Sequence, residues 1–329
     1  MQKLTRTLLA SLLLFAAPAT MSNATIAHAG EPPAVMASIK PVHSLVAGVM
    51  QGVGTPGLIV DGAASPHDYA LKPSQAQALQ EAKLVFWIGQ NLETFLEKPL
   101  QSIASDSTAV ELSAADGMSF HAFREIEELD GKGHSHGHSH GHSHGHGHGH
   151  GHDHASGDDP HVWLDPQNAT AMVVAIEAAL VKTDPANADA YKANAENLRV
   201  RLAELDNELA ASMKDLGGRP FVVFHDAYQY FERRYGLEAS GAIAMRADTA
   251  PGAAHVAEIS KRIKKMGVVC VFSEPQFEPR LISVVTEGAE ARTATLDPLG
   301  ASLENGPDQY FQLMRDMAVS FRQCLTGTS

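Results

Sequence analysis

A long segment without helix breakers divides this chain into two parts. From Asp184 to Leu216 the only Gly or Pro is Pro185, next to the start. The apolar residues of the segment recur at steps of seven, four, three, four and four, which places them on one face of a helix. These residues are Tyr191, Leu198, Leu202, Leu205, Leu209 and Met213. A helix of about 30 residues is about 45 Å long, more than one compact domain needs. We therefore predict that residues 184–216 form a rigid connector between two lobes.

Short apolar runs alternate with longer helical patterns on both sides of this connector. The runs before it include VMASI, GLIV, LVFWIG and TAVEL, and those after it include PFVVFHDA, VVCVFSEP and TATLDPLG. Such alternation indicates βαβ units with buried parallel strands. The predicted fold class is therefore α/β, with two lobes of mainly parallel sheet, residues 30–183 and 217–329, joined by a single long helix.

The first 29 residues have the pattern of a secretory signal peptide. Lys3 and Arg6 precede an apolar run at residues 8–17, and the tripeptide AHA that ends at Ala29 has the small-x-small form of a cleavage site. The apolar run is shorter than the roughly 20 residues that a membrane-spanning helix needs. We expect an exported protein that is cleaved near Ala29.

The net charge limits the partners that this chain can have. The formal charge of the 329 residues is −13, and it becomes −15 when the leader leaves with two positive charges and no negative one. So acidic a chain is repelled by nucleic acid and by anionic lipid, whereas it suits a soluble protein that handles cations. We expect no nucleic-acid partner.

The two cysteines, Cys270 and Cys324, both lie in the last quarter of the chain. In an exported protein an even pair most simply forms a disulfide, which here would tie a strand to the C-terminal helix. Two reduced, buried thiols are the alternative.

Eleven of the 18 histidines lie in one low-complexity segment, GKGHSHGHSHGHSHGHGHGHGHDH. They are His134, His136, His138, His140, His142, His144, His146, His148, His150, His152 and His154. The segment has too much Gly and too few apolar residues to fold, so we predict a disordered loop at about residues 125–158 of the first lobe. Its weak sites could raise the local metal concentration or sense excess metal. A solubilising insertion that binds metal incidentally is the alternative.

Three other histidines follow or end strand-like segments. They are His67 in GLIVDGAASPHDY, His161 in DDPHVWLDP and His225 in PFVVFHDAYQYF. In open α/β sheets ligands bind at the carboxyl ends of strands, so residues from two lobes can converge on one cleft. Three neutral imidazoles suit Zn²⁺ well and oxygen-preferring Mn²⁺ or Mg²⁺ poorly. Because the three histidines are far apart in sequence, these patterns alone do not decide whether they meet at one site.

Several strings of this chain resemble the zinc-binding periplasmic component of bacterial high-affinity zinc ABC importers. SPHDYALKPSQAQAL, PHVWLDP, FHDAYQYFERRYGL, FSEPQF and TLDPLG occur in the family's order and span essentially the whole mature chain. The resemblance implies two α/β lobes bridged by a rigid helix, with the metal in the cleft between them. It also implies a periplasmic location, an inner-membrane ABC permease with its ATPase as partners, a periplasmic zinc chaperone as a further candidate partner, and a monomer.

The resemblance also assigns residues. The family's metal ligands fall on His67, His161 and His225. Related manganese and iron binders have a carboxylate at the third position, so zinc is the expected metal and manganese the second choice. Some zinc-binding relatives have a Glu just before the first ligand, where this chain has Pro66. Water or Asp297 of TLDPLG is then left to complete a tetrahedron. The pair Cys270 and Cys324 matches the family's disulfide.

Two other classes of function compete with a transport receptor that catalyses nothing. Three histidines and a water also form the coordination of zinc hydrolases. However, the chain has neither H-E-x-x-H nor G-x-S-x-G, and its only candidate general base is Glu274, for which a structural role at a strand end is favoured. The third possibility is a zinc store or chaperone that depends mainly on the histidine run.

Overall fold

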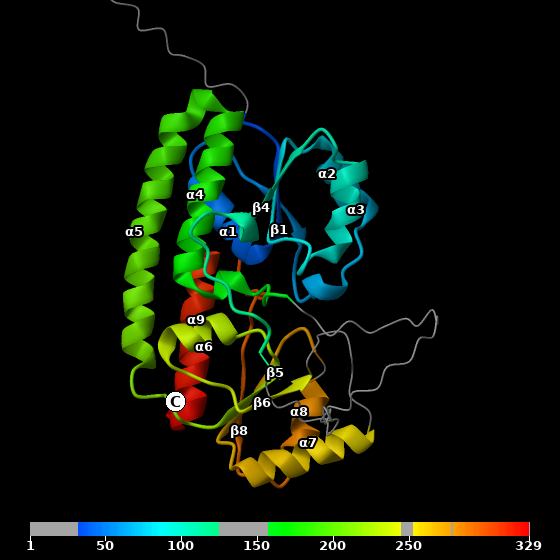
Figure 1. The fold of residues 1–329 in the computed structure, drawn as a ribbon, viewed down its shortest axis with the longest axis vertical. Coiled ribbons are helices and arrows are strands. Elements are labelled where there is room, and N and C mark those ends of the chain that lie inside the picture. The colour runs from blue at the N-terminus through cyan, green and yellow to red at the C-terminus, as the bar shows by residue number, and fades with distance from the viewer. Residues whose placement is uncertain (1–31, 125–156, 245–252, 278, 329) are drawn as a thin grey trace, which may run out of the picture.

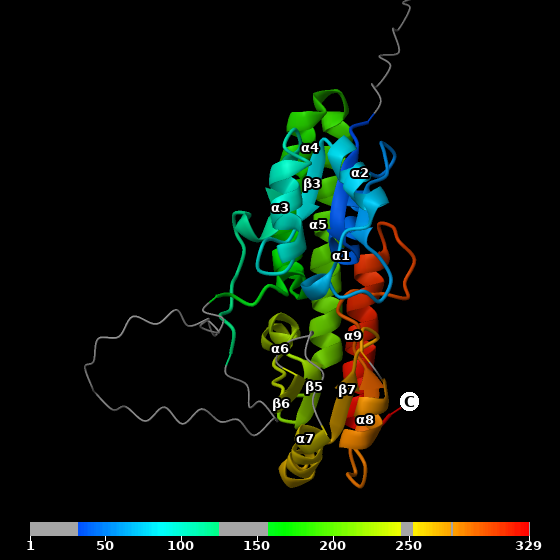
Figure 2. The same ribbon diagram turned by 90° about the vertical axis from the view of Figure 1, so that its right-hand side faces the viewer.

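Two parallel sheets lie toward opposite ends of an elongated molecule (Figures 1 and 2). The computed structural model describes residues 32–124, 157–244, 253–277 and 279–328. The first sheet has the strand order β2-β1-β3-β4 and the second has the order β6-β5-β7-β8, and all neighbouring strands are parallel. The strands are β1 Val35–Ile39, β2 Gly57–Val60, β3 Leu84–Trp87, β4 Thr108–Glu111, β5 Phe221–His225, β6 Gly241–Ala244, β7 Cys270–Ser273 and β8 Arg292–Thr295. The predicted α/β class with mainly parallel sheets is confirmed.

Helices cover both sheets, as parallel sheets require. The α-helices of the described residues are α1 Lys40–Val49, α2 Pro73–Glu81, α3 Thr94–Ser102, α4 Pro166–Thr183, α5 Ala188–Met213, α6 Gln229–Tyr235, α7 Ala253–Met266, α8 Pro279–Val285 and α9 Gln309–Thr326. Short 3₁₀ turns are η1 Pro66–Asp68, η2 Leu112–Ala114, η3 Val162–Leu164 and η4 Pro185–Asn187. The central strands β1, β3 and β5 are buried along their whole length, whereas the edge strands β4 and β8 are largely exposed. No described helix is both long and apolar enough to cross a membrane.

The predicted connector is helix α5, which runs beside both lobes (Figures 1 and 2). All six apolar positions of its predicted face are buried. The helix begins at Ala188 rather than at Asp184, because Pro185 opens a separate 3₁₀ turn and the Asp184 carboxylate accepts hydrogen bonds from the side chains of Asn187 and Tyr191. Its 26 residues correspond to about 39 Å. The prediction of a long helix joining two lobes is therefore confirmed.

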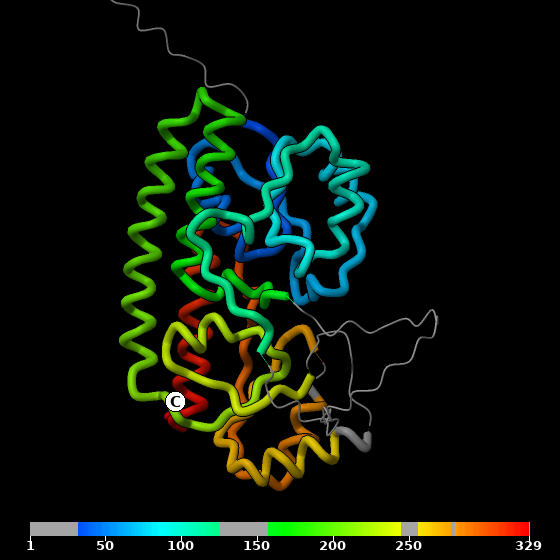
Figure 3. The backbone as a smooth tube through the Cα atoms, viewed as in Figure 1, coloured from blue at the N-terminus to red at the C-terminus, as the bar shows by residue number. Residues whose placement is uncertain are grey.

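A second connection between the lobes was not predicted. The chain leaves β8, passes to the N-terminal lobe and returns along α9, as the tube in Figure 3 shows. At the start of α9 the Tyr310 amide donates to the Ser44 hydroxyl at 3.0 Å, and Lys40 Nζ donates to the Leu303 carbonyl at 2.6 Å. Near its end α9 carries Cys324, which forms a disulfide with Cys270 of β7. The alternative of reduced thiols is therefore wrong in this structure, and α9 ties the second sheet to the first lobe.

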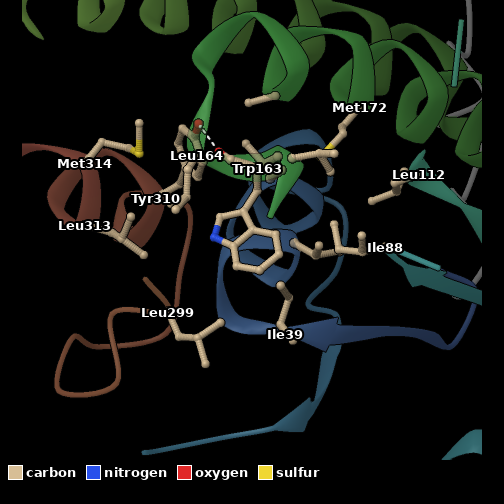
Figure 4. Close-up of a cluster of buried hydrophobic side chains, with 14 of the residues drawn as sticks. Ile39, Ile88, Leu112, Trp163, Leu164, Met172, Leu299, Tyr310, Leu313 and Met314 are labelled. Atoms are coloured by element: carbon tan, nitrogen blue, oxygen red, sulfur yellow. Dashed lines mark hydrogen bonds between the residues drawn. The ribbon is translucent and has the colours of Figure 1, made fainter. Parts of the chain in front are cut away.

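One hydrophobic cluster extends through both lobes, and a second lies within the C-terminal lobe. Trp163 is fully buried where the two lobes meet, among Ile39 and Ile88 of the N-terminal lobe and Leu299 and Tyr310 of the C-terminal part (Figure 4). Trp163 Nε1 donates to the Pro298 carbonyl at 2.8 Å, and the Tyr310 hydroxyl donates to the Trp163 carbonyl at 2.8 Å. Separating the lobes would expose this indole and break both bonds, so a wide hinge motion is disfavoured.

Two of the sequence predictions fall largely on residues that the structure does not describe. The signal peptide, residues 1–29, lies outside the described residues, as do all eleven histidines of the run. The ends of the predicted loop are described. Ala122 and Asp158 form an antiparallel bridge, and the Asp159 amide donates to the His121 carbonyl at 2.8 Å. The described segments before and after the histidine run are therefore paired with each other.

Candidate metal centre

The structure brings His67, His161 and His225 together between the lobes. His67 Nε2 lies 3.1 Å from His161 Nε2, and His225 Nε2 lies 3.4 Å from the same atom. One possible ligand atom from each histidine lies within 4.8 Å of the others, and these three form the only such group found among the described residues. The convergence that the sequence left open is thus present in the fold.

Each histidine is placed by its own local structure. His67 lies in η1, where Pro66 precedes it and its amide donates to the Ser65 hydroxyl at 3.3 Å. His161 comes just before η3, and its amide donates to the Asp159 carboxylate at 3.0 Å. His225 is the last residue of β5, at the carboxyl end of a central strand. The site therefore draws on loops of one lobe and a strand end of the other, as open α/β sheets favour.

Buried carboxylates orient two of the three rings. Asp159 Oδ1 lies 2.7 Å from His161 Nδ1, and Glu274 Oε1 lies 2.7 Å from His225 Nδ1. Since an ionised carboxylate can only accept, each Nδ1 carries the proton and each Nε2 presents its lone pair to the other rings. Converging lone pairs repel one another unless a cation or a proton lies between them. The arrangement is therefore suited to a metal ion with nitrogen ligands.

A hydrogen-bond network surrounds these carboxylates. Asp159, only 1% exposed, accepts from Gln229 Nε2 at 3.2 Å, and the Tyr230 hydroxyl donates to its backbone carbonyl at 2.8 Å. Beside His225, the Asp226 carboxylate pairs with the Arg124 guanidinium at 2.6 Å, and Arg124 also donates to the buried Glu232 at 2.8 Å. Arg124 is the last described residue before the histidine run. The network therefore links the last described residue before the run to Asp226, the residue next to a candidate ligand.

The protonation of His225 is set by two opposing effects. Burial lowers the pKa of this imidazole, but the charge of Glu274 and its hydrogen bond to Nδ1 outweigh burial, and the pKa is raised overall. A proton therefore competes with a metal for His225 at a higher pH than it would for an ordinary histidine.

Asp297, predicted as a fourth ligand or a supporting residue, does not belong to the histidine group. Its Oδ1 accepts from the amides of Leu299 and Gly300 at 3.1 and 3.0 Å, and its Oδ2 accepts from the amide of Ala301 at 2.6 Å. Oδ1 also accepts from Gln276 Nε2 at 3.2 Å. The carboxylate thus holds the turn that follows β8, and these donors occupy both of its oxygens.

Sequence reasoning missed part of the site. It treated Glu274 as either a general base or a structural carboxylate and did not identify it as the partner of His225. It did not single out Asp159 or Gln276 at all. Asp159 had a usable signal, since it lies two residues before His161 and can reach the same ring. Gln276 had none, because its position depends on the turn formed around Asp297.

A small cavity opens in front of the three rings. The centre of a water molecule can move within a volume of about 10 Å³ in this cavity. The walls include the three histidines, Trp163, Glu274, Gln276, Phe277 and Pro298. That volume is about what one water needs. The cavity therefore has room for a metal ion with a small additional ligand, and little room for an organic substrate.

Comparison with known proteins matches this geometry to a family. Residues 35–324 match the family model described as zinc-uptake complex component A, periplasmic. The high-affinity zinc uptake system protein ZnuA of Brucella suis biovar 1 (strain 1330) is 49% identical over 311 residues, which cover 91% of this chain and 93% of that protein. The ZnuA protein of Paracoccus denitrificans (strain Pd 1222) is 39% identical over 313 residues, covering 93% and 96%.

Solved structures agree on the fold. The crystal structure of a ZnuA deletion mutant with zinc bound matches with a TM-score of 0.70 at 23% identity, covering 91% of this chain and 98% of that one. At that level of identity the likeness supports the arrangement of two lobes and says nothing further about individual side chains.

Proposed function

Because this chain belongs to the family of periplasmic A components of zinc-uptake complexes, we propose that it captures Zn²⁺ and delivers it to an inner-membrane ABC permease and its ATPase. The ligands in this proposal are His67, His161 and His225, with the protein acting in the periplasm as a monomer after cleavage near Ala29. The observation that carries the proposal is the convergence of three Nε2 atoms, two of them on rings whose Nδ1 faces a buried carboxylate.

The donor atoms support zinc over manganese. All three ligands are imidazole nitrogens, which suit borderline ions such as Zn²⁺, whereas Mn²⁺ prefers carboxylate and water oxygens. The carboxylates beside two of the rings already have partners: Asp159 Oδ1 and Glu274 Oε1 hydrogen-bond the histidine rings, and Asp226 pairs with Arg124. Manganese therefore remains the second choice.

A receptor is favoured over a zinc hydrolase by the surroundings of the site. Glu274, the candidate general base, uses one oxygen to accept from both the backbone amide and Nδ1 of His225. The cavity is also too small for a bound ester or peptide group beside the metal. The same residues are well suited to holding an ion in a fixed geometry, which is the task of a transport receptor. We therefore propose that the protein has no catalytic activity of its own.

Release of zinc to the permease is proposed to need only small shifts of the lobes. The shared core at Trp163, the returning helix α9 and the connector α5 all oppose wide opening. Loop and side-chain movements around His67, the most exposed of the three histidines, are the easier route.

The histidine run is proposed as an accessory that captures zinc or regulates uptake. The described residues that flank it lie close to the site, because Arg124 pairs with Asp226 beside His225 and the described chain resumes at Gly157, four residues before His161. This location supports a role in raising the local zinc concentration. A periplasmic zinc chaperone is a further candidate partner of the protein.

Zinc titration of three proteins tests the proposal: the mature chain, a deletion of residues 131–154, and His161→Ala. We expect the deletion to keep one tight site and His161→Ala to lose it. In cells under zinc limitation, only His161→Ala should abolish growth. A chain that loses its tight zinc when the run is removed would instead be a store dominated by that run, and zinc-dependent esterase activity abolished by His161→Ala would indicate a hydrolase.

A further inference from the structure

Gln276 is a half-buried polar residue that lines the candidate site and has no part in the proposed ligand set. It follows β7 and lines the same cavity as His67, His161 and His225. Its Oε1 atom is buried and has no hydrogen-bond partner in the described part of the chain. A buried acceptor without a donor is unfavourable, so this oxygen calls for a ligand that can donate to it.

The orientation of the Gln276 amide is fixed by chemistry. Its Nε2 lies 3.2 Å from Asp297 Oδ1. A carboxylate only accepts hydrogen bonds, so the amide must turn its NH₂ group toward Asp297, and its carbonyl oxygen then points away from that carboxylate.

Asp297 is itself held in place. The amides of Leu299, Gly300 and Ala301 all donate to it from the turn that follows β8. The same turn is fixed to the first lobe, because Trp163 Nε1 donates to the Pro298 carbonyl. A series of hydrogen bonds thus orients the side-chain amide of a residue that lines the cavity.

Building on the proposed function, we propose that Gln276 is a positioning residue for the fourth ligand of zinc, a water molecule. The cavity is about the size that one water needs. A water bound to Zn²⁺ is a strong hydrogen-bond donor, and the Gln276 carbonyl accepts from it. Because the amide is neutral, it orients the water without adding a negative charge that would make zinc harder to release. Asp297, predicted from the sequence as a possible ligand, contributes by orienting Gln276.

The test combines zinc affinity with a visible spectrum. Zinc dissociation constants are measured on the mature chain by competition with a chelator, at less than one equivalent of metal so that the tight site fills first. Gln276→Leu removes the acceptor at similar size, and Asp297→Asn lets the amide turn round. Each substitution should lower the affinity for zinc about 10-fold, as the loss of groups that orient metal ligands typically does. The double variant should be no weaker than either single one, because both act through the same oxygen.

The Co²⁺-loaded protein reports on the fourth position directly. Azide should displace the water and change the visible spectrum of the unaltered protein, and it should bind several-fold more tightly to Gln276→Leu, in which the water is held less firmly. Gln77→Leu, on the exposed face of α2, is the matched control and should change neither measurement.

Three results would overturn the proposal: zinc affinity of Gln276→Leu within twofold of the unaltered protein, additive losses in the double variant, or a Co²⁺ spectrum that does not respond to azide, which would indicate direct ligation by the amide. If the unaltered chain lacks a tight site that depends on His161, the zinc-capture function itself is wrong, and this result is distinguishable from the other three.

Discussion

The two lobes hold their metal-facing histidines with the same chemistry but with different attachments. His225 and its partner Glu274 belong to one sheet, since they lie at the ends of the paired strands β5 and β7. His161 and its partner Asp159 lie on the first lobe's side, yet Asp159 is held by Gln229 and Tyr230 of α6 in the second lobe. One histidine is therefore fixed within a lobe and the other across the junction.

This difference indicates how affinity and lobe contact are coupled. Any movement that separates α6 from the segment around Asp159 weakens the orientation of His161, whereas the orientation of His225 is unaffected by it. Arg124 follows the same pattern, because it comes from the first lobe's side and pairs with Asp226 and Glu232 of the second. We expect His161 to be the ligand that responds to contact between the lobes and His225 to be the constant one.

Removing a ligand should have the largest effect. Alanine at His161 or at His225 leaves two imidazoles, and we expect zinc affinity to fall by about three orders of magnitude in both, since each imidazole contributes a metal bond. His67→Ala should lose nearly as much. Chelator competition measures all three, and circular dichroism with a thermal midpoint checks the fold. Unchanged tight binding in all three variants would contradict the assignment of the site.

Lowering the pH should have the next largest effect. A metal binds only the neutral imidazole, and Glu274 raises the pKa of His225 above its ordinary value. Affinity should therefore begin to fall above pH 6.5 and drop about 10-fold for each further pH unit below the raised pKa. Zinc titrations from pH 8 to pH 5 measure this. Glu274→Gln removes the charge that raises the pKa, so in that variant the loss should begin at a lower pH, and a curve that does not move would show that Glu274 has no such role.

The sequence predicted the lobes, the connector and the three histidines because each depends on local pattern or on a matching motif. Strand and helix periodicity are local, and the six apolar positions of α5 are buried as their spacing predicts. The sequence did not predict the hydrogen bonds that hold the site in place between the lobes. Trp163, Gln229 and Gln276 act through partners more than 20 residues away, and no periodicity shows which distant groups will meet. Asp297 shows the same limit, because its donors come from the geometry of its own turn.

Replacing the carboxylates should have a smaller effect than removing a ligand, and it compares the two attachments directly. Asp159→Asn and Glu274→Gln each keep the shape of the side chain but remove the charge that orients a histidine ring. Each should lower the affinity for zinc by about 10- to 100-fold at pH 7.5. The two variants should differ in pH dependence, because the charge and hydrogen bond of Glu274 raise the pKa of His225 more than the charge of Asp159 does. Titrations at pH 7.5 and pH 6 separate them. Parallel curves for the two variants would mean that the histidines are held in equivalent ways.

The smallest expected effect isolates the contact across the lobes. Gln229→Leu removes the hydrogen bonds that Gln229 Nε2 donates to Asp159 and to the Ala122 carbonyl, and it replaces neither a ligand nor its carboxylate. The change takes a donor from the Asp159 carboxylate and from the Ala122 carbonyl, which costs some stability, so a thermal midpoint checks that the fold is kept. The lost bond acts on zinc only through Asp159, which keeps its own bonds to the amide and Nδ1 of His161, so we expect a loss of about 2- to 10-fold in zinc affinity. The loss should appear as faster zinc release to a chelator in stopped-flow measurements, with Gln77→Leu as the control. Release that is as slow as in the unaltered protein would show that Asp159 holds His161 without help from the second lobe. The contact across the lobes would then have no effect on zinc binding.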